Sequence, residues 1–263
     1  MRRATTTRLA ALGATLAIAA STVTSRAAES SLVEAAREAL TELDVARAEA
    51  LLVAADASKP GAMVARALAA LDGGDYDRAV EILRAPALAH EPSAAELLGL
   101  ASSCARATAA ALMVDDAARG VRVRVQDEDD AVLVPEIVRV VEAARASLAT
   151  DLGVELPRPL RVEMVRDLFT LAAMTGIDES AVQNTGTVAI AKWGRVTIVS
   201  PRAMPDGYAW ADTLAHEMAH LAETRGSRDR APLWLQEGIA KREETRWRTA
   251  SPFDDLPAAD AVA

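Results

Sequence analysis

The stretch TVAIAKWGRVTIVS, residues 187–200, decides the fold of the C-terminal half of this 263-residue chain. Apolar residues alternate with small or polar ones in two short runs, and Trp193 and Gly194 stand between the runs. This pattern predicts a β-hairpin with its turn at those two residues. After the hairpin, a helix is expected from residue 206 or 207 to about residue 225, and another is expected to begin at Pro232.

Strand and helix patterns also alternate upstream of the hairpin. The segments VRVRV (121–125) and LRVEMV (160–165) predict strands. Residues 132–152 predict a long amphipathic helix ended by a glycine, and residues 167–176 predict a short one that ends in the same way. This order of elements predicts an α+β domain over residues 120–248.

The preceding region, residues 28–119, has a helical pattern with almost no strand signal. Two of its segments, LDVARAEALL (43–52) and GDYDRAVEIL (74–83), match each other at an offset of 74 − 43 = 31 residues. Small residues recur in both where helices must touch, which predicts stacked helical hairpins. Two further helices are expected at about 93–104 and 107–118.

One part of this region resembles a known repeat. The sequence ALAALDGGDYDRAVEILRAP resembles the turn and second helix of a tetratricopeptide repeat, with Gly73 and Gly74 at the turn and Ala79 at the close helix contact. The resemblance implies a TPR-like region whose helices can bind a protein partner. A plain α-helical bundle is the alternative.

The two ends of the chain do not read as parts of the fold. Residues 1–27 combine early arginines, an apolar run and small polar residues, which is typical of a cleaved secretory signal peptide. The apolar run is too short to span a bilayer comfortably, so no stable membrane span is expected after cleavage. The protein is therefore expected in the bacterial periplasm or outside the cell. Residues 249–263 are expected to be a disordered tail.

Composition excludes one class of function. The formal net charge is −9 and the pI is about 5.0, so the chain lacks the basic surface of a nucleic-acid binder. Cys104 is the single cysteine and cannot form an internal disulfide. Its small neighbours at helical spacing predict a buried thiol in the core.

A metal site is indicated by the motif HEMAH, which uses two of the three histidines. On a helix, His216 and His220 lie one turn apart on the same face, so both imidazoles can reach one zinc ion. Glu217 stands beside the first histidine, where it can accept a proton from a water next to the metal. A catalytic zinc site needs a third ligand. Glu237, on a new helix after a loop, is favoured over Glu223, which lies on the histidine helix in a cramped position.

The combination HEMAH…PLWLQEGIAKREE resembles gluzincin-type zinc metallopeptidases, and the sequence before it resembles bacterial peptidase MA-like domains. The resemblance covers about residues 120–248. It implies a zincin-like domain in which His216, His220 and Glu237 hold zinc and Glu217 is the catalytic base. The tyrosine or histidine that helps related enzymes bind the oxyanion has no counterpart downstream of Glu237.

Several side chains are candidates for supporting roles. Tyr208 is expected to pack or cap, and Arg246 or Arg248 could replace the missing oxyanion donor. Glu244 is expected either to support the metal site or to form a surface salt bridge. The strand at 195–200 is a candidate edge for main-chain pairing with an extended peptide.

These observations predict an exported zinc metallopeptidase that acts on a peptide or protein substrate. The first alternative is a non-catalytic interaction protein whose zinc site is structural or residual. The second is a zinc hydrolase acting on an amide that is not a peptide. Intact Glu217 disfavours the interaction protein, because a purely structural site has no use for it.

Overall fold

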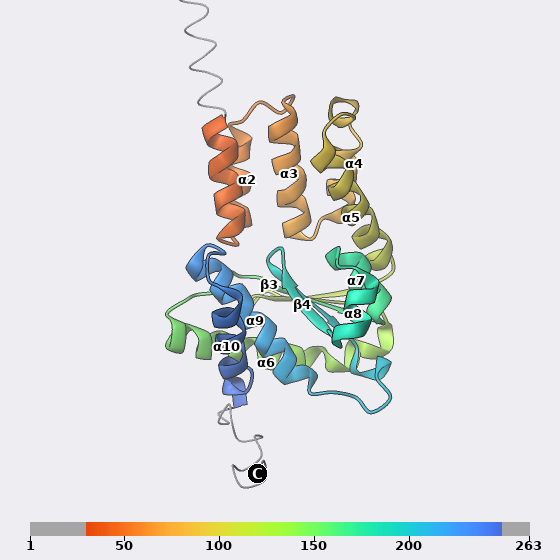
Figure 1. Ribbon diagram of the computed structural model, residues 1–263, viewed down its shortest axis with the longest axis vertical. Helices are drawn as coiled ribbons and strands as arrows, with labels where there is room; N and C mark the ends of the chain where they lie inside the picture. The colour runs from red at the N-terminus through yellow and green to blue at the C-terminus, as the bar shows by residue number, and fades with distance from the viewer. Residues whose placement is uncertain (1–29, 249–263) are drawn as a thin grey trace, which may run out of the picture.

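The computed structural model describes residues 30–248 of the chain. It confirms the α+β class and has three layers, with N-terminal helices above a sheet and C-terminal helices below it (Figure 1). The five strands are β1 (Leu112–Asp116), β2 (Val121–Val125), β3 (Leu160–Val165), β4 (Ala189–Lys192) and β5 (Arg195–Val199). Their order in the sheet is β1-β2-β3-β5-β4.

The predicted hairpin forms one edge of this sheet. β2, β3 and β5 run parallel in the centre, whereas β1 and β4 pair antiparallel at the two edges. Trp193 and Gly194 connect β4 to β5 with φ values of 51° and 64°. Two positive φ angles are what a two-residue hairpin turn requires, because its twist then matches that of the strands. The edge strand is therefore β4, and the expectation that residues 195–200 form an edge is wrong.

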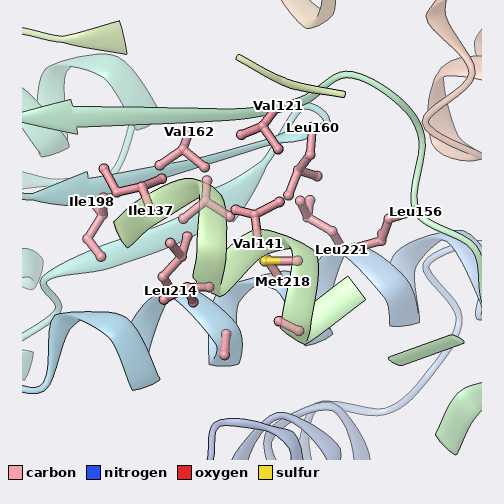
Figure 2. Packing of buried hydrophobic residues seen from close by; sticks show 14 of the residues in the cluster. Val121, Ile137, Val141, Leu156, Leu160, Val162, Ile198, Leu214, Met218 and Leu221 are labelled. Carbon is pink, nitrogen blue, oxygen red and sulfur yellow. The ribbon is translucent and has the colours of Figure 1, made fainter. Parts of the chain in front are cut away.

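The main apolar core lies between the sheet and two long helices, α6 (Val134–Leu152) and α9 (Trp210–Ser227). Alternate valines of β2 point into it, and Ile137 and Val141 of α6 and Leu214 and Met218 of α9 meet them there (Figure 2). Each side chain of this size contributes about 1.5–3 kcal/mol by leaving water. α6 ends where Gly153 adopts a left-handed conformation at φ 66°, as its sequence predicts.

Helices also cover the opposite face of the sheet. The chain is helical over 30–41, and the helices that follow are α2 (Val45–Val53), α3 (Pro60–Gly73), α4 (Tyr76–Leu83) and α5 (Pro92–Thr108). The other elements are α7 (Leu168–Thr175), α8 (Glu179–Thr185), α10 (Leu233–Glu243) and 3₁₀ turns at Pro86–Leu88, Glu128–Leu133, Pro201–Ala203 and Arg246–Arg248. α5 and α7 share a second core with the ends of β3 and β5.

The internal match at an offset of 31 residues corresponds to two equivalent helical turns. Leu43 and Gly74 occupy the same place and both have positive φ, 59° and 80°. The next residues, Asp44 and Asp75, cap α2 and α4, and each carboxylate accepts a hydrogen bond of 3.0 Å from the backbone N–H three residues on. The two matching segments therefore begin with the same kind of turn and the same kind of cap.

The helical layer is joined to the sheet by buried polar groups as well as apolar ones. The Tyr76 hydroxyl donates a hydrogen bond to Glu163 on β3. Arg195 of β5 is fully buried, with its Nε 3.5 Å from Glu163 Oε2. Arg161 donates from Nη2 to the backbone oxygen of Trp193 at 2.9 Å. The two regions are therefore held together by a buried ionic network.

Some expected elements differ from those observed. The helix expected over 107–118 is wrong, because α5 ends at Thr108 and β1 follows at 112–116. β1 forms by antiparallel pairing with β2, so the expected boundary between residues 119 and 120 falls inside a pair of neighbouring strands. The helix over 179–185 was not predicted. The histidine helix begins at residue 210 rather than 206 or 207.

The signal peptide expected at 1–27 and the tail expected at 249–263 lie outside the described residues. Within residues 30–248, no helix combines the length and apolar character needed to cross a membrane. Cys104 is a free, buried thiol, as predicted. Burial raises its pKa to about 11, so it is protonated and unreactive at neutral pH.

Candidate metal centre

Helix α9 presents the two histidines side by side. His216 and His220 are one turn apart, and their ring centroids lie 4.9 Å from each other with an interplanar angle of 79°. α9 packs on α6 through its apolar face, so the face that carries the histidines turns toward the hairpin and α10. The geometry that the i, i+4 spacing predicts is confirmed.

Helix α10 brings the third predicted ligand to the histidines. Glu237 Oε2 lies 3.6 Å from His216 Nε2, and its Oε1 lies 3.8 Å from His220 Nε2. One ligand atom from each of the three residues lies within 4.8 Å of the other two. The loop between α9 and α10 turns back through Arg228 and Asp229, both at positive φ, which allows α10 to pack against α9.

The remaining imidazole nitrogens face two other carboxylates. Glu244 Oε2 is 3.4 Å from His216 Nδ1, and Glu223 Oε2 is 3.7 Å from His220 Nδ1. Such carboxylates orient metal-binding imidazoles and increase their basicity. Glu223 therefore lies behind a histidine rather than among the ligands. Glu244 also pairs with Lys241, so the expected salt bridge is present, while its support of a metal site stays a prediction.

The donor set fits a metal ion such as zinc. Ligand atoms about 2.0–2.1 Å from a tetrahedral zinc ion lie ~3.3 Å from each other, slightly less than the separations of Glu237 from the two imidazoles. Both carboxylate oxygens of Glu223 are buried without a hydrogen-bond partner in the described chain. A small tightening around an ion would draw His220 toward Glu237 while its Nδ1 remains directed at Glu223.

Glu217 lines the same cleft as the ligands and is bonded to the edge strand. Its Oε2 accepts a hydrogen bond of 2.6 Å from the backbone N–H of Ala191 in β4. Burial raises the pKa of Glu217 above the usual value for a glutamate, although His220 and the bond from Ala191 oppose the shift. A buried carboxylate with a raised pKa is suited to accept and return a proton near neutral pH.

The two imidazoles differ in their proton affinity. Burial lowers the pKa of His216, and the neighbouring His220 lowers it further. Burial also acts to lower the pKa of His220, but the carboxylates of Glu223, Glu217 and Glu237 outweigh it, so that this pKa is raised. The surrounding carboxylates thus favour positive charge at the centre, whether a proton or a metal ion carries it.

The centre opens into a cleft of about 890 Å³. One wall is residues 187–193, which include β4, and the floor carries the histidines and Glu217. The other wall comes from the N-terminal layer, with Arg37, Thr41 and Asp72 among its residues. The sequence gives no sign of this wall, because nothing in local spacing relates α3 to a helix about 140 residues later.

The candidates for an oxyanion donor lie elsewhere. The Tyr208 hydroxyl donates to the backbone oxygen of Val199 and its ring packs against the main core, so Tyr208 packs, as one of its two expected roles, and does not cap α9. Arg246 pairs with Asp151, and Arg248 pairs with Asp212. These three side chains are not among the described residues that line the cleft.

The resemblance to gluzincin peptidases thus rests on two motifs, and the fold brings the side chains of both motifs together. The two histidines and the intervening glutamate come from α9, and the third carboxylate comes from α10. Comparison with protein-family models, with curated proteins and with solved structures found no match to this chain.

Proposed function

We propose that this protein is a zinc-dependent metallopeptidase of the gluzincin type. One observation carries the proposal: Glu237 lies close to the Nε2 atoms of both His216 and His220, while Glu217, on the histidine helix, is bonded to the edge strand beside them. A purely structural metal site needs Glu237, His216 and His220 but has no use for Glu217. A buried glutamate in a cleft beside the metal ligands is what hydrolysis requires.

In the proposed hydrolysis, the metal, the base and the supporting carboxylates have separate roles. Zinc, when bound, supplies a Lewis acid that makes a nearby water more acidic and stabilises negative charge on the oxygen of the scissile carbonyl. Glu217 accepts the proton of the attacking water and passes it to the leaving amine. Glu244 and Glu223 keep the imidazoles of His216 and His220 in the orientation that directs their Nε2 atoms to the metal.

The edge strand supplies a place for an extended peptide. The N–H of Ala191 points out of the sheet toward Glu217, and alternate residues of a strand point their backbone groups to the same side. The backbone groups of Ala189 and Ala191 therefore face the cleft. The Ala191 N–H is already bonded to Glu217, so a peptide would pair with the backbone groups of Ala189 and the carbonyl of Ala191, and would lie across the metal centre with a main-chain carbonyl near Glu217.

Two features support a zincin-like domain preceded by a TPR-like region. A sheet covered by α6 and α9, with an antiparallel edge strand beside the histidine helix, is the arrangement expected of a zincin-like domain. The equivalent turns at Leu43 and Gly74 support a TPR-like region before it. Export to the periplasm or the cell exterior remains part of the proposal and rests on the sequence of residues 1–27.

The second candidate is a non-catalytic binding protein. The observation that favours it is the absence of Tyr208, Arg246 and Arg248 from the described residues that line the cleft. Without a donor for the oxyanion, hydrolysis would depend on the metal alone. A protein of this kind would bind a peptide on β4 and release it uncut.

Cleavage of a mixed peptide library separates the two candidates. The mature chain is loaded with zinc and compared with Glu217→Gln, which keeps the ligands but cannot accept the proton. Products that appear with the wild type and disappear with the variant support the peptidase. A folded wild type with one zinc per chain and no products, or equal products from both proteins, would exclude it.

A further inference from the structure

The N-terminal helices form part of the candidate substrate cleft. The helix over 30–41 contributes Arg37 and Thr41, and the last turn of α3 contributes Asp72. A substrate that lies on β4 must therefore pass along these helices. The side chains on this wall are in a position to select it.

Several contacts hold the wall in place against the rest of the molecule. Glu42, after the first helix, pairs with Arg228 at 3.2 Å, and its backbone oxygen accepts a hydrogen bond from Arg225 near the end of α9. Leu43 is buried in the same core as α6 and α9. On the other side, Tyr76 bonds to Glu163 on the sheet. The wall is thus fixed both to the histidine helix and to the sheet.

Asp72 is the unusual side chain on this wall. It is only 8% exposed, yet it lines the cleft. Its Oδ1 has no hydrogen-bond partner, and no ion pair to Asp72 is found among residues 30–248. Burial raises the pKa of Asp72, and Arg161 and Arg195 oppose this shift through space without contacting the carboxylate. A buried carboxylate without a direct partner is costly, so a partner that arrives with the substrate would be bound favourably.

Several other charged groups of the cleft have partners of their own, whereas Arg37 and Asp229 form no ion pair among the described residues. Glu217, Glu237 and Glu244 belong to the metal centre. The Lys192 ammonium lies 4.2 Å from the centroid of the Trp193 ring and donates to a backbone oxygen of α7 at 3.4 Å. These contacts keep Lys192 occupied, so it does not neutralise Asp72.

The position of Asp72 relates it to the bond that would be cut. Gly74, two residues later, packs on Arg161, and Arg161 bonds to the backbone oxygen of Trp193 at the hairpin turn. Trp193 is two strand positions, or about 7 Å, from Ala191, the residue beside Glu217. Because Asp72 and β4 line the same cleft, we expect a long side chain one or two residues from the scissile bond to reach from β4 to Asp72.

We propose that Asp72 is a specificity-determining residue that selects substrates with a lysine or arginine side chain close to the cleavage site. This inference rests on the proposed peptidase function and names its substrate class. An ammonium or guanidinium group would pair with the free carboxylate in a setting from which water is largely excluded. A neutral side chain of equal length would leave that carboxylate unpaired.

Binding tests the inference separately from cleavage. The zinc-loaded Glu217→Gln chain is titrated into dye-labelled random hexapeptides in which one central position is fixed as lysine or as norleucine, at pH 8. We expect the lysine pool to bind about tenfold more tightly. Adding Asp72→Asn or Asp72→Ser should make the two affinities equal. Asp77→Asn, an exposed aspartate on the adjoining α4, is the matched control and should preserve the preference.

The outcomes are distinct from those of the cleavage experiment. The role of Asp72 is overturned if Asp72→Asn and Asp72→Ser both leave the lysine preference intact. It is also overturned if the Glu217→Gln chain shows no preference for lysine. Glu217-dependent cleavage without a preference for basic residues overturns it as well, but keeps the peptidase. A preference that depends on Asp72, together with a wild type that cuts no peptide, keeps the recognition role and removes the peptidase.

Discussion

The hydrogen bond between Tyr76 and Glu163 should contribute measurably to stability, because it links the helical layer to the sheet inside the protein. Replacing Tyr76 with phenylalanine removes one hydroxyl and keeps the ring, so the change leaves almost no cavity. Glu163 Oε1 then retains only Arg124 Nη1, at 3.3 Å, as a hydrogen-bond donor. A hydrogen bond to a buried charged group contributes about 1.5–3 kcal/mol, and we expect a loss of about 2 kcal/mol in the free energy of unfolding.

The assay is urea unfolding of the chain in the presence of a chelator, which removes any contribution of metal binding to stability. With a slope of 2–3 kcal/mol per molar urea, the midpoint should fall by about 1 M. Tyr208→Phe is the matched control, because Tyr208 donates to the neutral backbone oxygen of Val199 and should lose only about 1 kcal/mol. A cost for Tyr76→Phe no larger than that for Tyr208→Phe would refute the account of the buried network.

Three further predictions concern the metal, the helical turn and pH. Glu244→Gln should weaken zinc affinity by about 10–100-fold, measured by competition with a chelator, because the imidazole of His216 loses the carboxylate that orients it. Gly74→Ala should lower the free energy of unfolding more than Gly153→Ala; both have positive φ, but only at Gly74 would the new methyl lie 2.3 Å from Arg161 Nη1. The backbone cost alone is about 1 kcal/mol, and equal losses would contradict the packing of Arg161. Burial raises the pKa of Asp72 to about 7 in the folded chain. As pH rises, the unfolded chain therefore loses the Asp72 proton first, near pH 4, while the folded chain keeps it. The stability that the protonated group gives below about pH 4 is then lost between pH 4 and pH 7. We therefore expect Asp72→Asn to become more stable relative to the wild type between pH 4 and 7, by at most about 4 kcal/mol in the free energy of unfolding, and this difference should then stay level. A difference that does not change with pH would contradict this.

The parts of the fold that follow from local chemistry could be predicted from the sequence. Two alternating runs with Gly194 between them indicate a hairpin, because glycine readily adopts the positive φ angle that a two-residue turn requires. Gly153 and Gly176 end helices for the same conformational reason. The histidine pair is equally local, since spacing on one helix determines which face both rings share.

The parts that depend on distant contacts could not be predicted. The segment LMVDD of β1 does not alternate, and pairing with β2 makes it a strand. The sequence also does not show which strand of the hairpin pairs with a third strand, and β4 rather than residues 195–200 forms the edge. Asp72 had no motif to mark it, because its significance comes from the unpaired carboxylate and from the cleft beside it.

The central claim is that His216, His220 and Glu237 hold one zinc ion beside Glu217. Its most direct test is the zinc content of the purified, dialysed chain, measured by elemental mass spectrometry for the wild type, Glu217→Gln and Glu237→Gln. The account predicts one zinc per chain in the wild type and in Glu217→Gln, and a large loss in Glu237→Gln. A folded wild type without zinc, or full zinc content in Glu237→Gln, would contradict it.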